Sequence, residues 1–117
     1  MLRFGEEPFL ECSSKGDKRF SAFYAKWRGK SIEDRYQAAK VFEDGSSGLS
    51  WREAKGKKPV NAEEVRGYYS ALWNHYFEEN PELLEVIKQY NGFSDIFGQP
   101  GHACQAEEIY RIRKEKT

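Results

Sequence analysis

Cysteine, charge of one sign and long apolar runs are all scarce in this sequence. Its two cysteines, Cys12 and Cys104, lie far apart in 117 residues, which argues against a disulfide framework, so we expect both to be thiols. The 19 basic residues balance 19 acidic ones, which excludes the broad positive field needed for generic nucleic-acid binding. Because the sequence has neither a run of about 18 apolar residues nor the apolar core of a signal peptide, it predicts a cytoplasmic protein with no membrane segment.

Aromatic residues, in contrast, are abundant. Phe, Tyr and Trp make up 15% of the chain, enough to build a core although 32% of the residues are charged. A chain of this length buries one core, so we expect a single domain over residues 1–117. The order of its elements predicts a helix-rich α+β fold in which about four to five helices pack with a few short strands.

Several stretches carry the apolar period or the capping residues of helices. The first begins at Ser31 and is expected to reach about Glu43, with Ile32, Tyr36, Ala39 and Phe42 as its apolar stripe. Further helices are expected at about residues 50–56, 61–79, 81–90 and 105–115. Residues 4–12 predict a short strand, and residues 19–27 predict either a strand or an aromatic-lined loop.

Three polar residues share one face of the helix that begins at Ser31. Glu33, Gln37 and Lys40 follow at steps of four and three, so a carboxylate, an amide and an ammonium lie together beside the apolar stripe. Such a face can hold a polar ligand. The alternative is a solvent-exposed face with a weak pairing of carboxylate and lysine.

Two neighbouring segments can add to such a site. The first contains Phe20, Phe23, Tyr24 and Trp27, which can stack on a nucleobase, although a strand packed on the core explains them equally well. The second is the glycine-rich stretch 97–102, whose composition exceeds what a simple connection demands.

Other polar residues suggest weaker hypotheses. The two histidines and two cysteines lack the paired spacing of a zinc site, so no metal is expected. His102 and Cys104 suggest a cysteine–histidine dyad, but a loop histidine beside a buried thiol is the simpler interpretation. The basic run Lys55, Lys57 and Lys58 can contact a phosphate, although a solvated loop is again simpler.

Residues 20–23 (FSAF) and 29–40 (GKSIEDRYQAAK) resemble the opening signature of the NADAR superfamily, the NAD- and ADP-ribose-associated domains. That signature pairs a phenylalanine-serine-x-phenylalanine element with a helix start carrying glutamate and an aromatic-glutamine-alanine-x-lysine run. Residues 69–77 are similar to the family's long helix, and residues 95–98 (DIFG) to its aspartate-x-aromatic-glycine loop. The likeness spans roughly residues 19–113.

The resemblance implies cleavage of the N-glycosidic bond in a ribosylated base or an ADP-ribose-type nucleotide. Water would attack the anomeric carbon through an oxocarbenium-like state, with Glu33 first and Asp95 second as the catalytic carboxylates. No cofactor is implied, and the ligand would be a small nucleotide or ADP-ribose-like molecule. The implied substrate-binding residues are Phe20, Ser21, Phe23, Trp27, Gln37, Lys40, Gly98 and His102.

Departures from the family pattern keep other functions open. Trp27 precedes Gly29, whereas the family has its tryptophan between the glycine and the glutamate, and the final glycine-rich loop is reduced to residues 98–101. A non-catalytic nucleotide-binding module is therefore one alternative. The abundance of Tyr and Trp suggests another, a small protein-interaction domain with an exposed aromatic patch away from Glu33. The N-glycosidase hypothesis requires that Glu33 and Asp95 open into the same cleft. The oligomeric state has no sequence signal.

Overall fold

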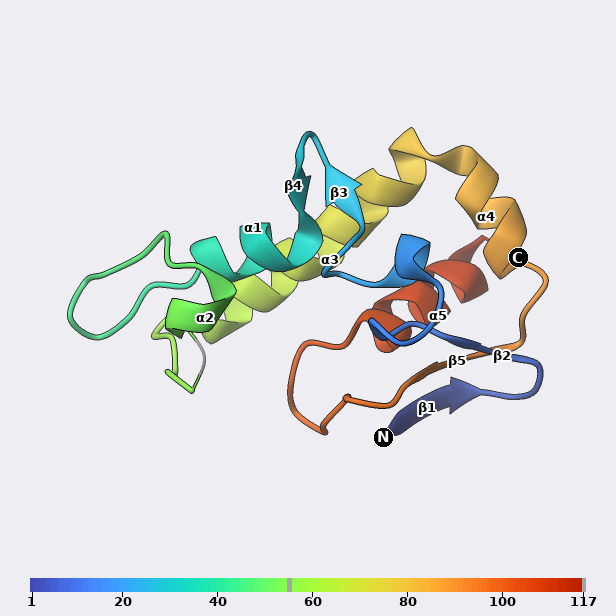
Figure 1. Ribbon diagram of the computed structural model, residues 1–117, viewed down its shortest axis with the longest axis horizontal. Coiled ribbons are helices and arrows are strands. Elements are labelled where there is room, and N and C mark those ends of the chain that lie inside the picture. The colour runs from blue at the N-terminus through green and yellow to red at the C-terminus, as the bar shows by residue number, and fades with distance from the viewer. Residues whose placement is uncertain (55, 117) are drawn as a thin grey trace.

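The long helix α3 (Ala62–Glu79) forms the axis of the molecule in a computed structural model that describes residues 1–54 and 56–116 (Figure 1). The molecule measures 45 × 28 × 23 Å. Short helices lie at one end of α3, and a sheet with the C-terminal helices lies at the other (Figure 1). The remaining helices are α1 (Ile32–Ala38), α2 (Trp51–Ala54), α4 (Pro81–Ile87) and α5 (Gln105–Glu115). The helix-rich α+β class is confirmed.

The main sheet has three strands in the order β1-β5-β2. Its central strand β5 (Gly92–Asp95) pairs antiparallel with β1 (Leu2–Gly5) and parallel with β2 (Phe9–Glu11). All four residues of β5 are buried, because the strand lies between two neighbours and α5 packs against it. The sequence predicted one N-terminal strand where two form, and β5 was not anticipated, since Asn91 and Gly92 indicated only the end of a helix.

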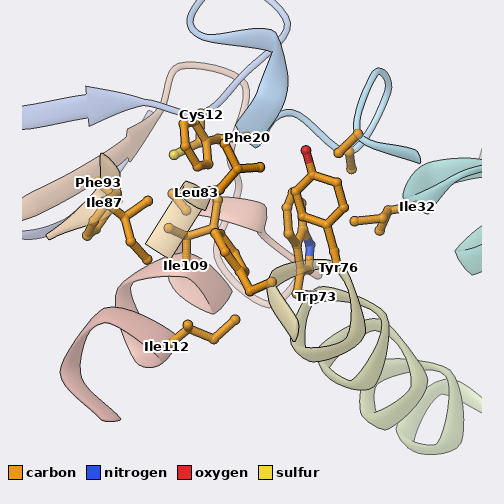
Figure 2. Packing of buried hydrophobic residues seen from close by; sticks show 14 of the residues in the cluster. Cys12, Phe20, Ile32, Trp73, Tyr76, Leu83, Ile87, Phe93, Ile109 and Ile112 are labelled. Atoms are coloured by element: carbon orange, nitrogen blue, oxygen red, sulfur yellow. The ribbon is translucent and has the colours of Figure 1, made fainter. Parts of the chain in front are cut away.

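The core joins the sheet, α3, α4 and α5 (Figure 2). Trp73 of α3, Phe20, Phe93 of β5 and Ile109 of α5 are completely or almost completely inaccessible. Burial of each such side chain contributes about 1.5 to 3 kcal/mol of transfer free energy. The predicted apolar pattern of α3 is confirmed, because its buried residues are Val65, Tyr69, Leu72, Trp73, Tyr76 and Phe77.

Helix α1 ends earlier than the sequence predicts. It stops at Ala38 instead of about Glu43, so the prediction of its C-terminal boundary was wrong. Asn61, far along the chain, is the physical reason: its Nδ2 donates to the carbonyl of Ala39 and its Oδ1 accepts from the amide of Val41. These bonds draw the chain away from the helical path. Ser50 and Glu53 form the predicted capping box at α2.

The aromatic segment 19–27 is mainly a succession of turns. It contains a 3₁₀ helix, η1 (Lys18–Phe20), and ends in the two-residue strand β3 (Lys26–Trp27), which pairs with β4 (Lys30–Ser31). The hairpin turns at Arg28 and Gly29, both with positive φ, the geometry that suits a two-residue connection. The hairpin leads directly into α1, whose first turn is capped by the hydroxyl of Ser31 accepting from the amide of Asp34.

Within the described residues, no helix combines the length and the apolar character that crossing a bilayer requires.

Candidate functional site

A cleft of about 400 Å³ opens where α1, the turn after η1 and the connection from β5 to α5 meet. We call it the acidic cleft, because Glu33 of α1 and Asp95 of β5 both line it. Its size lies in the range of small-molecule sites. Two acidic residues from distant parts of the sequence therefore share one hollow, the arrangement that the N-glycosidase hypothesis requires.

Glu33 is a half-buried carboxylate in the first turn of α1. Its Oε1 accepts a 2.7 Å hydrogen bond from Nε2 of Gln37, one turn further along the helix. Burial raises the pKa of Glu33, and the opposing effects of Gln37 and the Lys40 ammonium do not cancel that rise. A carboxylate with a raised pKa accepts a proton more readily, which suits a general base.

Asp95 is buried at the end of β5, and the protein already hydrogen-bonds both of its oxygens. Oδ1 accepts from the amide of Phe97 at 2.9 Å, and Oδ2 accepts from Nε2 of Gln105 at 2.8 Å. Asp95 is therefore the more rigidly held of the two acids.

A chain of hydrogen bonds connects the two acidic residues. The amide of Ala22 donates to Oε1 of Gln105 at 2.6 Å, and the carbonyl of Ala22 accepts from the amide of Glu33 at 2.9 Å. Gln105 in turn binds Asp95. The buried Gln105 thus ties the start of α1 to the end of β5. Sequence reasoning did not select it, because no local pattern distinguishes it from other polar residues at a helix start.

Glu11 of β2 holds the same end of β5 from the other side. Its Oε1 accepts from the hydroxyl of Ser94 at 2.8 Å, and its Oε2 accepts from the amides of Ser13 and Ile96, each at 3.1 Å. Burial on its own would raise the pKa of Glu11, but these hydrogen bonds outweigh it and lower the pKa. Glu11 therefore stabilises the strand end at which Asp95 lies. No local pattern around Glu11 predicts this role.

Aromatic and loop residues complete the acidic cleft. Phe23 and Phe97 line it with side chains that are 44% and 60% exposed. Gly98 and the exposed His102 also line it, as the resemblance implies. At Gly98 an added Cβ would lie about 3.0 Å from the Leu2 side chain, so close packing also explains the glycine. Phe97 belongs to the recognised motif but was not predicted to bind substrate.

Four residues predicted to bind substrate do not line the acidic cleft: Phe20, Ser21, Trp27 and Lys40. Phe20 and Ser21 are completely buried, so neither side chain can reach a ligand, and those predictions were wrong. The Trp27 ring stacks on His75 at a centroid distance of 5.0 Å and does not line the acidic cleft. The cause is local: Phe20 ends η1 and is buried by it, whereas Phe23 lies in the turn that follows and stays at the surface.

A second cleft of about 520 Å³ adjoins the first, and Gln37, His102 and Ala103 line both. Lys40 lines this second cleft and not the acidic one, and burial lowers its pKa although Glu33 opposes that change. We call it the basic cleft, because its cationic residues are Lys40, Lys57, Lys58 and Arg66. Lys55, the first lysine of the predicted basic run, lies outside the described residues.

A third hollow, of about 690 Å³, lies on a different side of α1. Its carboxylates, Asp34 and Glu53, are both exposed to solvent. Neither is buried as Glu33 is. The acidic cleft is therefore the better candidate for chemistry, although it is smaller.

The cysteines are buried free thiols, as expected. Burial raises the pKa of both Cys12 and Cys104, which disfavours the thiolate that a nucleophile requires. The cysteine–histidine dyad is accordingly a poor candidate.

No model of a known protein family matches this chain, and no curated protein matches it either.

Proposed function

We propose that the acidic cleft hydrolyses the N-glycosidic bond of a ribosylated base or an ADP-ribose-type nucleotide. The observation that carries the proposal is that Glu33 and Asp95 line one cleft of small-molecule size. The resemblance of residues 19–113 to the NADAR superfamily supports the same reaction. Carboxylates beside an anomeric carbon are suited to this chemistry, because the transition state carries positive charge on the sugar.

Glu33 is assigned the role of general base. A water molecule attacks C1′ of the ribose and passes one proton to the Glu33 carboxylate. The bond between C1′ and the base nitrogen breaks, and its electron pair leaves with the base. A neutral leaving base takes one proton from solvent, whereas a cationic ring such as the nicotinamide of NAD leaves as the neutral base without one. Glu33 then releases its proton to solvent and returns to the carboxylate. The products are a ribose with a hydroxyl at C1′ and a free base.

Asp95 and Gln37 are assigned supporting roles. Asp95 places a second carboxylate at the cleft, where it stabilises the positive charge that develops on the sugar. Gln37 orients Glu33 through its Nε2, and its Oε1 has no hydrogen-bond partner among the described residues. That oxygen is buried, so the role assigned to Gln37 is to orient Glu33.

Phe23 and Phe97 are assigned the role of stacking on the nucleobase of the substrate. Both line the acidic cleft and keep a large part of their surface exposed, as a stacking platform must. Stacking of a base on an aromatic side chain contributes about 1 to 3 kcal/mol. These residues replace Phe20 and Trp27, which the sequence favoured for this role.

The test is release of free base from NAD, ADP-ribosylated bases and simple ribosides, measured by chromatography. Glu33→Gln keeps the shape and removes the charge, and we expect it to slow release about a hundredfold or more. Asp34→Asn is the matched control, since it makes the same change one residue along at an exposed position, and it should retain the wild-type rate. Wild-type rates in Glu33→Gln would refute the assignment of Glu33, and absence of release by the wild type would refute the proposal.

A non-catalytic nucleotide-binding module is the second candidate. It is favoured by Asp95, whose two oxygens are both occupied by hydrogen bonds within the protein. A rise in melting temperature with ADP-ribose or NAD, without release of base, would support this candidate over hydrolysis. The protein-interaction alternative predicts an exposed aromatic patch away from Glu33. Of the exposed aromatic residues Phe23, Tyr24 and Phe97, two line the cleft that contains Glu33 and Tyr24 lies outside it.

A further inference from the structure

The basic cleft concentrates positive charge in a chain that has none overall. Nineteen basic residues balance nineteen acidic ones, yet Lys40, Lys57, Lys58 and Arg66 line this hollow together with a single described acid, Glu63. Two acids outside the lining, Glu33 and Asp44, act on Lys40 and Lys57 without forming a salt bridge. None of these four cations forms a salt bridge with another described residue. Their charge is therefore available to an anion from outside the protein.

Aromatic rings support two of these ammonium groups. Nζ of Lys40 lies 4.8 Å from the centroid of the Tyr36 ring, and Nζ of Lys57 lies 5.7 Å from that of Phe42. Such contacts restrict a lysine side chain without neutralising it. The two cations are thus partly positioned before any ligand binds.

The basic cleft adjoins the acidic one along three shared residues. Gln37, His102 and Ala103 line both hollows, and the amide of Gln37 binds the Glu33 carboxylate. A ligand whose sugar lies against Glu33 would therefore extend past Gln37 toward the lysines. The anions that commonly extend from a ribose are phosphate groups esterified to one of its hydroxyls.

We propose that the basic cleft binds the phosphate groups of a ribosyl substrate whose anomeric carbon lies in the acidic cleft. The inference rests on the proposed function and makes phosphorylated ribosides its preferred substrates. A small nucleotide is favoured over a nucleic-acid chain, because the cleft measures only about 520 Å³ and the protein has no net charge.

The test compares AMP with adenosine, which share the same N-glycosidic bond and differ by one phosphate. By calorimetry, we expect the wild type to bind AMP at least about tenfold more tightly, and added salt to weaken AMP binding alone. The double variant Lys57→Gln, Lys58→Gln should lose this preference. The matched control Lys26→Gln, Lys30→Gln removes two exposed lysines from the β3–β4 hairpin and should keep it.

The outcomes separate this inference from the proposed function. Equal binding of AMP and adenosine by the wild type, or an unchanged preference in the Lys57, Lys58 variant, would overturn the phosphate site and leave base release by the acidic cleft intact. Inorganic pyrophosphate serves as a probe without a sugar. If its binding depends on Lys57 and Lys58 while no riboside releases base, the phosphate site stands and the proposed function falls.

Discussion

Glu11 and Glu33 are both partly buried glutamates, but they lie in contrasting regions of the molecule. In the sheet, Glu11 accepts three hydrogen bonds, from Ser13, Ser94 and Ile96, and its pKa is lowered. At the acidic cleft, Glu33 accepts one from Gln37, and burial raises its pKa. The sheet holds its carboxylate with three protein groups, whereas among the described residues the cleft holds its carboxylate with one. A carboxylate kept in such a place at a cost to stability is a candidate for function.

The two shifts have opposite consequences for stability. A folded-state pKa below the ordinary value of 4.5 means that ionised Glu11 stabilises the fold above that pH, and that this contribution is lost as pH falls through the lowered pKa. A raised folded-state pKa means that ionised Glu33 costs stability above its folded-state pKa. The cost disappears below the pKa of the unfolded chain.

Removing the carboxylate on the sheet side should have the largest effect. We expect Glu11→Ala to lower the free energy of unfolding by about 2 to 3 kcal/mol at neutral pH, because buried donors lose a charged acceptor. Denaturant titration measures the loss, which should shrink as pH falls through the lowered pKa of Glu11. Glu6→Ala, an exposed neighbour, serves as the control. A loss below about 0.5 kcal/mol would show that the two regions do not differ in this way.

A smaller effect should follow from changing the electrostatic neighbour of Glu33. Lys40 lowers the pKa of Glu33, so Lys40→Met should raise that pKa further. If Glu33 acts as a base, kcat plotted against pH should begin its fall in acid at a higher pH than in the wild type. At a fixed pH within that fall, kcat should be lower by about threefold. An unphosphorylated riboside should be used, so that loss of a phosphate contact does not contribute. If the pH dependence of kcat is the same in the variant and the wild type, Lys40 does not affect the pKa of the catalytic base.

Local sequence patterns predicted the helices better than the sheet. The apolar period of α3 and the capping box of α2 depend on residues close in sequence, and both were confirmed. The end of α1 depends on Asn61, and β5 is four residues long and buried by packing from α5, so neither has a local signal. Features that depend on contacts between residues far apart in sequence could therefore not be predicted from local patterns.

The candidate site shows the same division. The helical period correctly brought Glu33 and Gln37 together, and the motif at residues 95–98 added Asp95 to their cleft. Gln105 and Glu11 were missed, because the bonds that give them their roles join residues 83 apart in sequence. Phe20 was assigned to the ligand because turns, unlike helices, give no period from which the direction of a side chain follows.

The most direct test of the contrast is the unfolding free energy of Glu33→Gln and of the wild type, measured by denaturant titration from about pH 3 to about pH 8. Glutamine can keep the hydrogen bond from Gln37 and carries no charge. We therefore predict that the variant is more stable by about 0.5 to 1 kcal/mol at neutral pH, and that the difference vanishes in acid. A variant that is less stable than the wild type at neutral pH would contradict the central claim that the cleft holds Glu33 at a cost to the fold.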